Sequence, residues 1–265
     1  MFMQRLITTL ILAPLVLLGI FLAPAWLLGG VLVIILLLAG YESLKLIPLS
    51  NVLIQGLFLG LLLFSFWASS YVYHVWLSIG LVFWLFNCVA ILSFPNSQDY
   101  WGYPIVVAIA CLVLLPLFAQ SLIHLYHLPR GKALIVYLLF LIWASDIGAY
   151  LTGKKWGTHK LIPQVSPGKS WEGVAGGFGL SMVVALIGHF CFQSGFEPLW
   201  FILAFITVLI SIFGDLFISI LKRRCHLKDT GNIIPGHGGI LDRLDSLIAA
   251  LPVFYFGLTL IRTGY

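Results

Sequence analysis

Charged residues are scarce in this sequence: Asp, Glu, Lys and Arg together make up 9% of its 265 residues. An average soluble domain carries about 25%. The hydrophobic share is 61% and the mean hydropathy is +1.09, which is more apolar surface than a soluble fold can bury. This shortage of charge excludes an ordinary soluble protein and indicates a chain whose surroundings are mostly lipid.

Paired cysteines and long basic runs are also missing. The cysteines form no Cys-x-x-Cys pair, which argues against a zinc site or a redox pair. The net charge of +5 comes from 14 basic and 9 acidic residues. Because the basic residues form no long run, the sequence does not suggest nucleic-acid binding. The four isolated cysteines are Cys88, Cys111, Cys191 and Cys225.

Nine apolar stretches are long enough to cross a bilayer, which takes about 20 residues in a helix. The first two share one apolar run divided near Pro24, so eight spans is the alternative count. Ala23-Pro24-Ala25 fits a signal-peptide cleavage pattern, but the apolar run continues to Gly40, so we expect an uncleaved first span. The expected spans are 6–22, 24–44, 52–70, 74–94, 103–125, 131–152, 174–195, 198–221 and 241–262.

The predicted fold class is therefore all-α, a polytopic integral membrane protein with about nine transmembrane helices. We expect one transmembrane catalytic domain over residues 1–265, in which 1–130 form a helical scaffold and 131–265 carry the active site. Two segments, 153–173 and 222–240, are polar, glycine-rich and basic, and such loops usually carry function.

The basic residues predict an orientation. With nine spans, the N-terminus and both polar segments fall on one side of the membrane. That side is predicted to be the cytoplasm because basic residues are enriched in cytoplasmic loops. It holds Arg5, Lys45, Lys154, Lys155, Lys160, Lys169, Lys222, Arg223, Arg224, Lys228 and Arg243, against Arg130, Lys132 and Arg262 on the other side.

The few acidic residues gather at the polar segments. Asp146 and Asp215 fall toward the ends of apolar spans, where a carboxylate is costly and by default marks a functional site. A carboxylate that reaches the lipid headgroups is the alternative. Six of the nine acids lie in or beside the two segments: Asp146, Glu172, Asp215, Asp229, Asp242 and Asp245.

The spacing of these acids predicts a metal site. Asp215, Ser219 and Lys222 follow one another at i, i+4 and i+7 and so share a helix face. Asp242 and Asp245 also share a face. Two such carboxylate sets beside a basic loop suit Mg²⁺, which takes oxygen ligands and substrate phosphates. Ordinary interfacial salt bridges are the alternative interpretation.

Between these two sets runs a glycine-rich stretch, Gly231–Gly239. Glycines let backbone amides approach phosphate oxygens, so this loop is a candidate anion cradle. Lys222, Arg223 and Lys228 add charge that can hold phosphates. His237, between the glycines, is predicted to contact a phosphate, with a purely structural role as the alternative.

The other polar segment contains Gly168-Lys169-Ser170, which resembles the end of a Walker A motif. Position 163 is Pro where that motif needs Gly, and no β-strand is expected before it, so we exclude a P-loop. Lys169 remains a candidate phosphate contact. The glycines that follow are expected to allow close helix packing rather than to bind a nucleotide. They are Gly173, Gly176, Gly177 and Gly179.

The run from Ser219 to Asp245 resembles the signature of the phosphatidate cytidylyltransferases, also called CDP-diglyceride synthetases. Ser-Pro-Gly-Lys-Ser-Trp-Glu-Gly at 166–173 resembles a second segment of that family. The resemblance implies a homodimeric enzyme of the bacterial inner membrane that uses CTP, phosphatidic acid and Mg²⁺, with a second cation also compatible. It implies metal ligands at Asp215, Asp242 and Asp245.

The same resemblance assigns catalytic roles to Asp215, Lys222, Arg223, Asp242 and Asp245. It implies nucleotide or phosphate contacts at Ser219, Lys228, Asp229, His237, Gly238 and Gly239. The second segment and the neighbouring charges add the remaining candidate substrate contacts, which are Asp146, Ser166, Lys169, Ser170, Glu172 and Arg243.

The expected reaction joins the lipid phosphate to the α-phosphorus of CTP and releases pyrophosphate. The nucleophile is already an anion, so positioning and charge neutralisation suffice without a strong base. A CTP-dependent lipid kinase, which would release CDP, is one alternative. An ion-coupled transporter is another, but it favours midplane charges and inverted repeats, whereas these charges gather at one membrane face.

Overall fold

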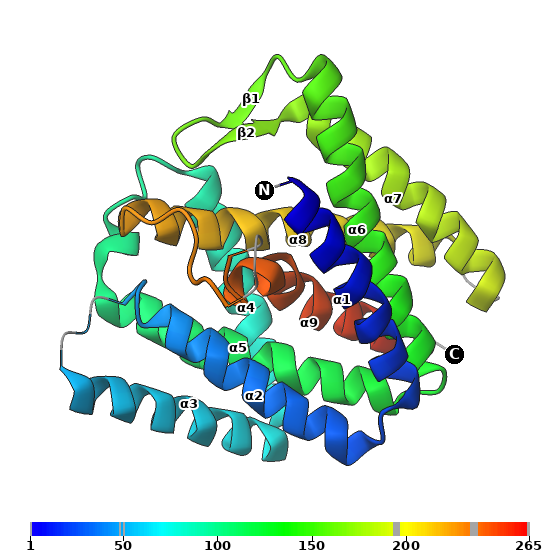
Figure 1. Ribbon diagram of the computed structural model, residues 1–265. Helices are drawn as coiled ribbons and strands as arrows, with labels where there is room; N and C mark the ends of the chain where they lie inside the picture. The colour runs from blue at the N-terminus through cyan, green and yellow to red at the C-terminus, as the bar shows by residue number, and fades with distance from the viewer. Residues whose placement is uncertain (1, 48, 50, 193–196, 234–237, 264–265) are drawn as a thin grey trace.

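The computed structural model describes residues 2–47, 49, 51–192, 197–233 and 238–263. Nine α-helices run through this described part, and together they confirm the predicted all-α membrane fold (Figure 1). They are α1 Phe2–Leu22, α2 Ala25–Ser43, α3 Val52–Tyr71, α4 Tyr73–Leu92, α5 Pro104–His127, α6 Gly131–Trp156, α7 Trp171–Phe192, α8 Glu197–Arg224 and α9 Leu241–Thr263.

Eight of these helices, α2 to α9, are long and apolar enough to cross a membrane. Within the residues searched, α1 offers the shorter apolar stretch Leu10–Leu22. Every predicted span therefore corresponds to a helix, while the choice between eight and nine crossings depends on α1.

Two helices extend at least three residues past their predicted ends. α6 continues to Trp156 rather than 152, and α8 continues to Arg224 rather than 221. Both last turns are basic, with Lys154 and Lys155 on α6 and Lys222 to Arg224 on α8. Cations are favourable at a helix C-terminus, and their long stems let the charge leave the apolar layer. Hydropathy alone therefore places the C-terminal ends of α6 and α8 too early.

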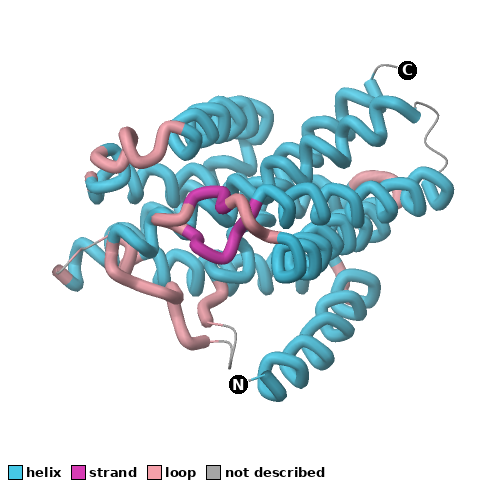
Figure 2. Tube along the Cα trace, turned by 90° about the horizontal axis from the view of Figure 1, so that it is seen from above, coloured by secondary structure: helices cyan, strands magenta, loops and turns pink. Residues whose placement is uncertain are grey.

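A small hairpin is the exception to the all-helical prediction. Strands β1 (Lys160–Ile162) and β2 (Ser166–Ser170) pair antiparallel, with Lys160 opposite Ser170. The Gly-Lys-Ser sequence lies inside β2, which leads directly into α7, so it forms no loop of the Walker type. Seen from above, the hairpin lies over the middle of the helix ends (Figure 2).

The helices pack around α5, the most buried span, which contacts α2, α3, α4, α6 and α9. Glycines bring two helix pairs close together. A Cβ on Gly148 of α6 would lie 2.4 Å from the Gly176 carbonyl oxygen of α7, and one on Gly214 of α8 would lie 2.4 Å from the Asp245 carbonyl oxygen of α9. The prediction that the glycines opening α7 serve packing is confirmed for Gly173, Gly176 and Gly177, where a Cβ would come close to α6. It is wrong for Gly179, where nothing lies within 4 Å.

The helix connections gather at two ends of the bundle. At the first, which we call the site end, Arg224 donates to the Gln98 carbonyl (2.8 Å) and Arg223 to the Val165 carbonyl (3.1 Å). Burial raises the pKa of the Cys225 thiol, which stays neutral and donates to the Leu46 carbonyl. The α2–α3, α4–α5, α6–α7 and α8–α9 connections therefore meet there, so both predicted polar segments lie at the same end.

The opposite end joins the remaining connections that the structure describes. The Tyr126 hydroxyl donates to the Ala23 carbonyl (3.0 Å), and Lys132 Nζ donates to the Phe21 carbonyl (2.7 Å). The α1–α2 and α5–α6 connections therefore meet here, far from the hairpin.

Candidate active site

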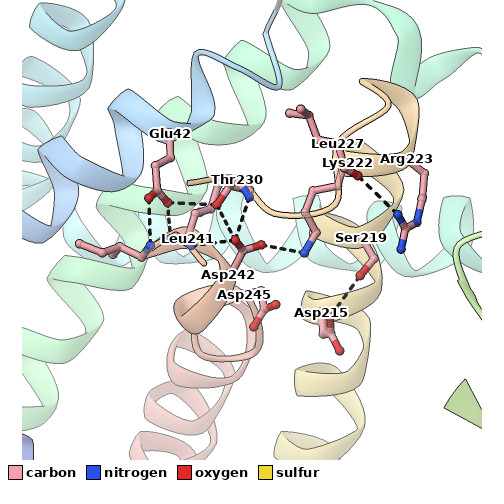
Figure 3. A network of polar contacts seen from close by, with 12 residues as sticks. Glu42, Asp215, Ser219, Lys222, Arg223, Leu227, Thr230, Leu241, Asp242 and Asp245 are labelled. Atoms are coloured by element: carbon pink, nitrogen blue, oxygen red, sulfur yellow. Dashed lines mark hydrogen bonds and ion pairs between the residues drawn. The ribbon is translucent and has the colours of Figure 1, made fainter. Parts of the chain in front are cut away.

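Three carboxylates from three helices converge on one lysine at the site end. Lys169 Nζ on β2 lies 2.5 Å from Asp215 Oδ2 on α8, and Ser219 Oγ donates to Asp215 Oδ1 (3.2 Å). The predicted one-face arrangement of Asp215 and Ser219 is therefore present. Asp245 on α9 lies beside Asp215 (Figure 3), close enough to interact electrostatically with it and with Lys169. Asp146 on α6 interacts with both in the same way.

A second ion pair joins α8 to α9. Lys222 Nζ lies 2.7 Å from Asp242 Oδ1, and the Asp242 side chain is only 2% exposed. Asp242 Oδ2 accepts hydrogen bonds from the Thr230 amide (2.8 Å), the Thr230 hydroxyl (3.0 Å) and the Gly239 amide (3.0 Å). Both oxygens are therefore engaged within the protein, and Asp242 fixes the two ends of the α8–α9 loop to each other.

Glu42 on α2 is a member of this network that the sequence interpretation missed. It is 1% exposed. Its carboxylate accepts hydrogen bonds from the Leu241 amide (2.8 Å) and the Ile240 amide (3.1 Å), and it shares the single proton of the Thr230 hydroxyl (3.0 Å) with Asp242 (Figure 3). One turn later, Lys45 Nζ donates to the Thr230 carbonyl (3.0 Å). The end of α2, which belongs to the N-terminal half of the chain, therefore holds the α8–α9 loop in place.

The signal for Glu42 was available in the sequence. It is one of only nine acids and falls inside the predicted span 24–44, where an ionisable residue marks a functional site by default. Its partners lie almost 200 positions away, and no local spacing indicates them.

The glycine-rich loop is organised differently from a phosphate cradle in its described part. The amides of Thr230, Gly239, Ile240 and Leu241 all donate to Glu42 or Asp242. A Cβ on Gly239 would lie 2.3 Å from Glu42 Oε2, and one on Gly231 would lie 2.1 Å from Oε1. These two glycines let the loop wrap a protein carboxylate closely. The middle of the predicted cradle, residues 234–237, lies outside the described residues.

Several other predicted contacts lie around this centre. Arg223 is exposed and is turned toward the hairpin, where it binds the Val165 carbonyl. Arg243 is exposed on α9 and interacts electrostatically with Asp146. Lys228 and Asp229 are exposed on the α8–α9 loop.

Gly238 adopts φ +85°, and a Cβ there would meet Asp242 Oδ2 at 2.9 Å and Asp229 at 3.3 Å. This left-handed conformation favours glycine. His237 lies outside the described residues.

The hairpin residues other than Lys169 have local roles in the structure. Ser170 is buried, and its hydroxyl accepts the Gly173 amide (3.1 Å), which caps the start of α7. Ser166 pairs with Ile162 across the hairpin. Glu172 binds the Thr158 hydroxyl (2.8 Å) and the His159 ring (2.6 Å). These three residues shape the hairpin that carries Lys169.

The three carboxylates predicted to hold the metal ion, Asp215, Asp242 and Asp245, have different surroundings in the structure. Among the described residues, no three His, Cys, Asp or Glu side chains are grouped closely enough to hold a metal ion. Asp242 departs from the predicted set because Lys222 and the loop amides use both of its oxygens. Asp215 and Asp245 remain neighbours, and Mg²⁺ commonly takes one or two carboxylates together with substrate phosphates. The donor chemistry of that pair fits Mg²⁺.

Comparison with known proteins adds independent findings. A sequence profile described as the cytidylyltransferase family matches residues 3–261. A phosphatidate cytidylyltransferase of Pseudomonas aeruginosa is 42% identical over 181 residues, which cover 67% of this chain and 66% of the relative. One of Haemophilus influenzae is 42% identical over 185 residues, with 65% and 64% covered. One of Rickettsia bellii is 35% identical over 189 residues, with 69% and 81% covered. The chain thus matches slightly less than two thirds of the first two relatives.

Proposed function

Because the chain belongs to the cytidylyltransferase family over nearly its whole length, we propose that it is a phosphatidate cytidylyltransferase. The reaction joins CTP and phosphatidic acid to give CDP-diacylglycerol and pyrophosphate, a step of phospholipid biosynthesis. The names of the similar bacterial proteins support this assignment. The observation that carries it is the convergence of Lys169, Lys222 and three carboxylates at one end of a bundle of membrane-spanning helices.

The position of this cluster suits substrates from two phases. CTP is a soluble polyanion, and phosphatidic acid presents its phosphate at the membrane surface. A cluster at the ends of apolar helices, beside the exposed Arg223, Lys228 and Arg243, can meet both. A transporter would instead favour charges near the middle of the spans.

In the proposed reaction, an oxygen of the lipid phosphate attacks the α-phosphorus of CTP. The bond between the α-phosphorus and its bridging oxygen to the β-phosphate breaks, and pyrophosphate leaves with that electron pair. Lys169 and Lys222 hold phosphates through charged hydrogen bonds. No group has to remove a proton, since the attacking oxygen is already anionic, so these side chains act by positioning and neutralising charge.

A bound Mg²⁺ would supply neutralisation of the polyphosphate charge and of the leaving pyrophosphate. Asp215 and Asp245 are the residues that we propose to hold it, with Asp146 close enough to reinforce the negative field. Asp242 and Glu42 then shape the loop around the site. A second cation is compatible with three carboxylates in this space.

We further propose a homodimer in the bacterial inner membrane, with the site end facing the cytoplasm where CTP is found. The basic residues support this orientation, because eleven of them belong to segments on the site side and three to the other side.

The assay for this function uses purified protein with labelled CTP, phosphatidic acid and Mg²⁺. We expect CDP-diacylglycerol and pyrophosphate in equal amounts, and neither product without the lipid. CDP with a phosphorylated lipid alcohol would instead identify a lipid kinase. Absence of both reactions in folded protein would refute the proposal.

A further inference from the structure

A cavity of about 570 Å³ lies at the opposite end of the bundle, away from the proposed active site. Its walls come from three places in the chain: Phe21 on α1, Tyr126 and Leu128 at the end of α5, and Phe192 on α7. Arg130 and Lys132, at the turn into α6, also line it. An apolar cavity with two cations at its rim is suited to an amphiphilic anion.

The charges of Arg130 and Lys132 are not neutralised by any described side chain. Arg130 Nη1 donates to the Cys191 carbonyl (3.3 Å), and Lys132 Nζ donates to the Phe21 carbonyl and lies 5.2 Å from the centre of the Tyr126 ring. The lysines at the active site differ, since Lys169 and Lys222 each pair with a carboxylate. The eight acids whose side chains the structure describes all lie on or toward the site end.

Helix α1 is attached to the bundle mainly beside this cavity. Within Leu10–Leu22 of α1, only Ile20 is buried. The bonds from Lys132 and Tyr126 reach the carbonyls of Phe21 and Ala23, where α1 ends. Seen from above, the rest of α1 stands apart from the other helices (Figure 2). A ligand in the cavity would therefore touch both α1 and the ends of α5, α6 and α7 that line the cavity with it.

We propose that this cavity binds one anionic phospholipid of the surrounding membrane. Its phosphate lies between Arg130 and Lys132, and its chains lie along the apolar walls beside Phe21 and Phe192. The bound lipid places a negative charge beside these two cations and fastens α1 to the bundle. This site is separate from the active site, and it does not depend on the proposed reaction.

The test compares protein in phosphatidylcholine nanodiscs with and without phosphatidylglycerol. We expect phosphatidylglycerol to raise the melting temperature, and native mass spectrometry to show one retained molecule per chain. Arg130→Asn should weaken that retention about fivefold, and adding Lys132→Met should weaken it about fivefold again, as expected for charges near an anionic lipid. Inorganic phosphate should have no effect, because it lacks the chains.

Arg130→Asn keeps the test available if the double variant fails to fold. Its side chain is exposed, and its φ of 58° is a conformation that Asn adopts readily. The matched control is Lys154→Met with Lys155→Met, two basic residues at the other end of α6 that lie over aromatic rings. Equal phosphatidylglycerol retention in wild type and Arg130→Asn, or an equal loss in the control, would overturn the proposal.

Discussion

At the scale of single residues, each lysine of the site is paired with a carboxylate. Lys169 reaches Asp215 from the hairpin, and Lys222 reaches Asp242 from α8. The two carboxylates differ in what else they bind among the described residues, because Asp242 also accepts hydrogen bonds from loop amides while Asp215 accepts one further bond, from Ser219. Asp215 is therefore the carboxylate at which a metal ion can replace the paired lysine.

We expect Lys169→Met to bind Mg²⁺ more tightly than wild type in the absence of CTP, because the ammonium no longer competes for Asp215. Turnover should nevertheless fall about ten- to hundredfold, since a charged hydrogen bond to phosphate is worth roughly 1.5–3 kcal/mol. Titration calorimetry with Mg²⁺ and the cytidylyltransferase assay measure the two effects.

Two further variants serve as controls for the Lys169→Met measurement. Lys154→Met removes the same charge from the end of α6 and should change neither quantity. Asp215→Asn should stay folded but lose Mg²⁺ binding and nearly all turnover. Unchanged Mg²⁺ affinity in Lys169→Met would show that Asp215 is not a metal ligand.

Glu42 provides a second residue-level prediction. In Glu42→Gln, the new NH₂ group faces backbone amides that are themselves donors, so one buried donor loses its acceptor. We expect the free energy of unfolding to fall by about 1–3 kcal/mol. Turnover per folded molecule should fall at least about tenfold because the loop that leads into α9 and Asp242 shifts.

Ser43→Ala is the matched control for Glu42→Gln. Ser43 is the next residue on α2, is also buried, and bonds to the Ala39 carbonyl of its own helix (2.8 Å). Its loss should change stability without changing turnover per folded molecule. Wild-type turnover in folded Glu42→Gln would exclude a role for Glu42 in shaping the site.

At the scale of helices and strands, sequence periodicity and hydropathy predicted most of the architecture. Each apolar run became a helix, and the spacing of Asp215 and Ser219 correctly predicted their shared face. Periodicity and hydropathy indicate only which residues are neighbours within one helix or strand. They could not indicate that β2 brings Lys169 to Asp215, or that Glu42 meets Thr230, since those contacts depend on how distant elements pack.

The α6–α7 pair gives a prediction at this scale. In Gly148→Ala, the added Cβ would lie 2.4 Å from a backbone oxygen of α7, so the helices must move apart. We expect a loss of about 1–3 kcal/mol in unfolding free energy, as for other overpacked sites. Gly179→Ala on α7 meets nothing within 4 Å and should be neutral or stabilising by about 0.5–1 kcal/mol. Thermal unfolding in detergent compares them, and equal melting temperatures would contradict the close packing.

At the scale of the whole molecule, the two halves of the chain are not independent. α2 lies in the part that the sequence suggested was only a scaffold, yet Glu42 and Lys45 hold the loop between α8 and α9. The site end thus depends on both halves, while the opposite end carries helix connections and the proposed lipid cavity. This polarity makes the number of membrane crossings a functional question, since the proposed function requires the site to face the compartment that holds CTP.

The last prediction concerns α1 and the orientation of the chain. Eight helices satisfy the length and hydropathy of a span, whereas the stretch Leu10–Leu22 of α1 is shorter than the roughly 20 residues that a crossing takes. If α1 also crosses, nine crossings put the two termini on opposite sides. We expect a reporter fused before Met1 to indicate the cytoplasm, and reporters after Tyr265 and in the turn at Arg130 to indicate the outside. If the first reporter also indicates the outside while the other two are unchanged, α1 does not cross the membrane. If the Arg130 reporter indicates the cytoplasm, the proposed orientation of the active site is wrong.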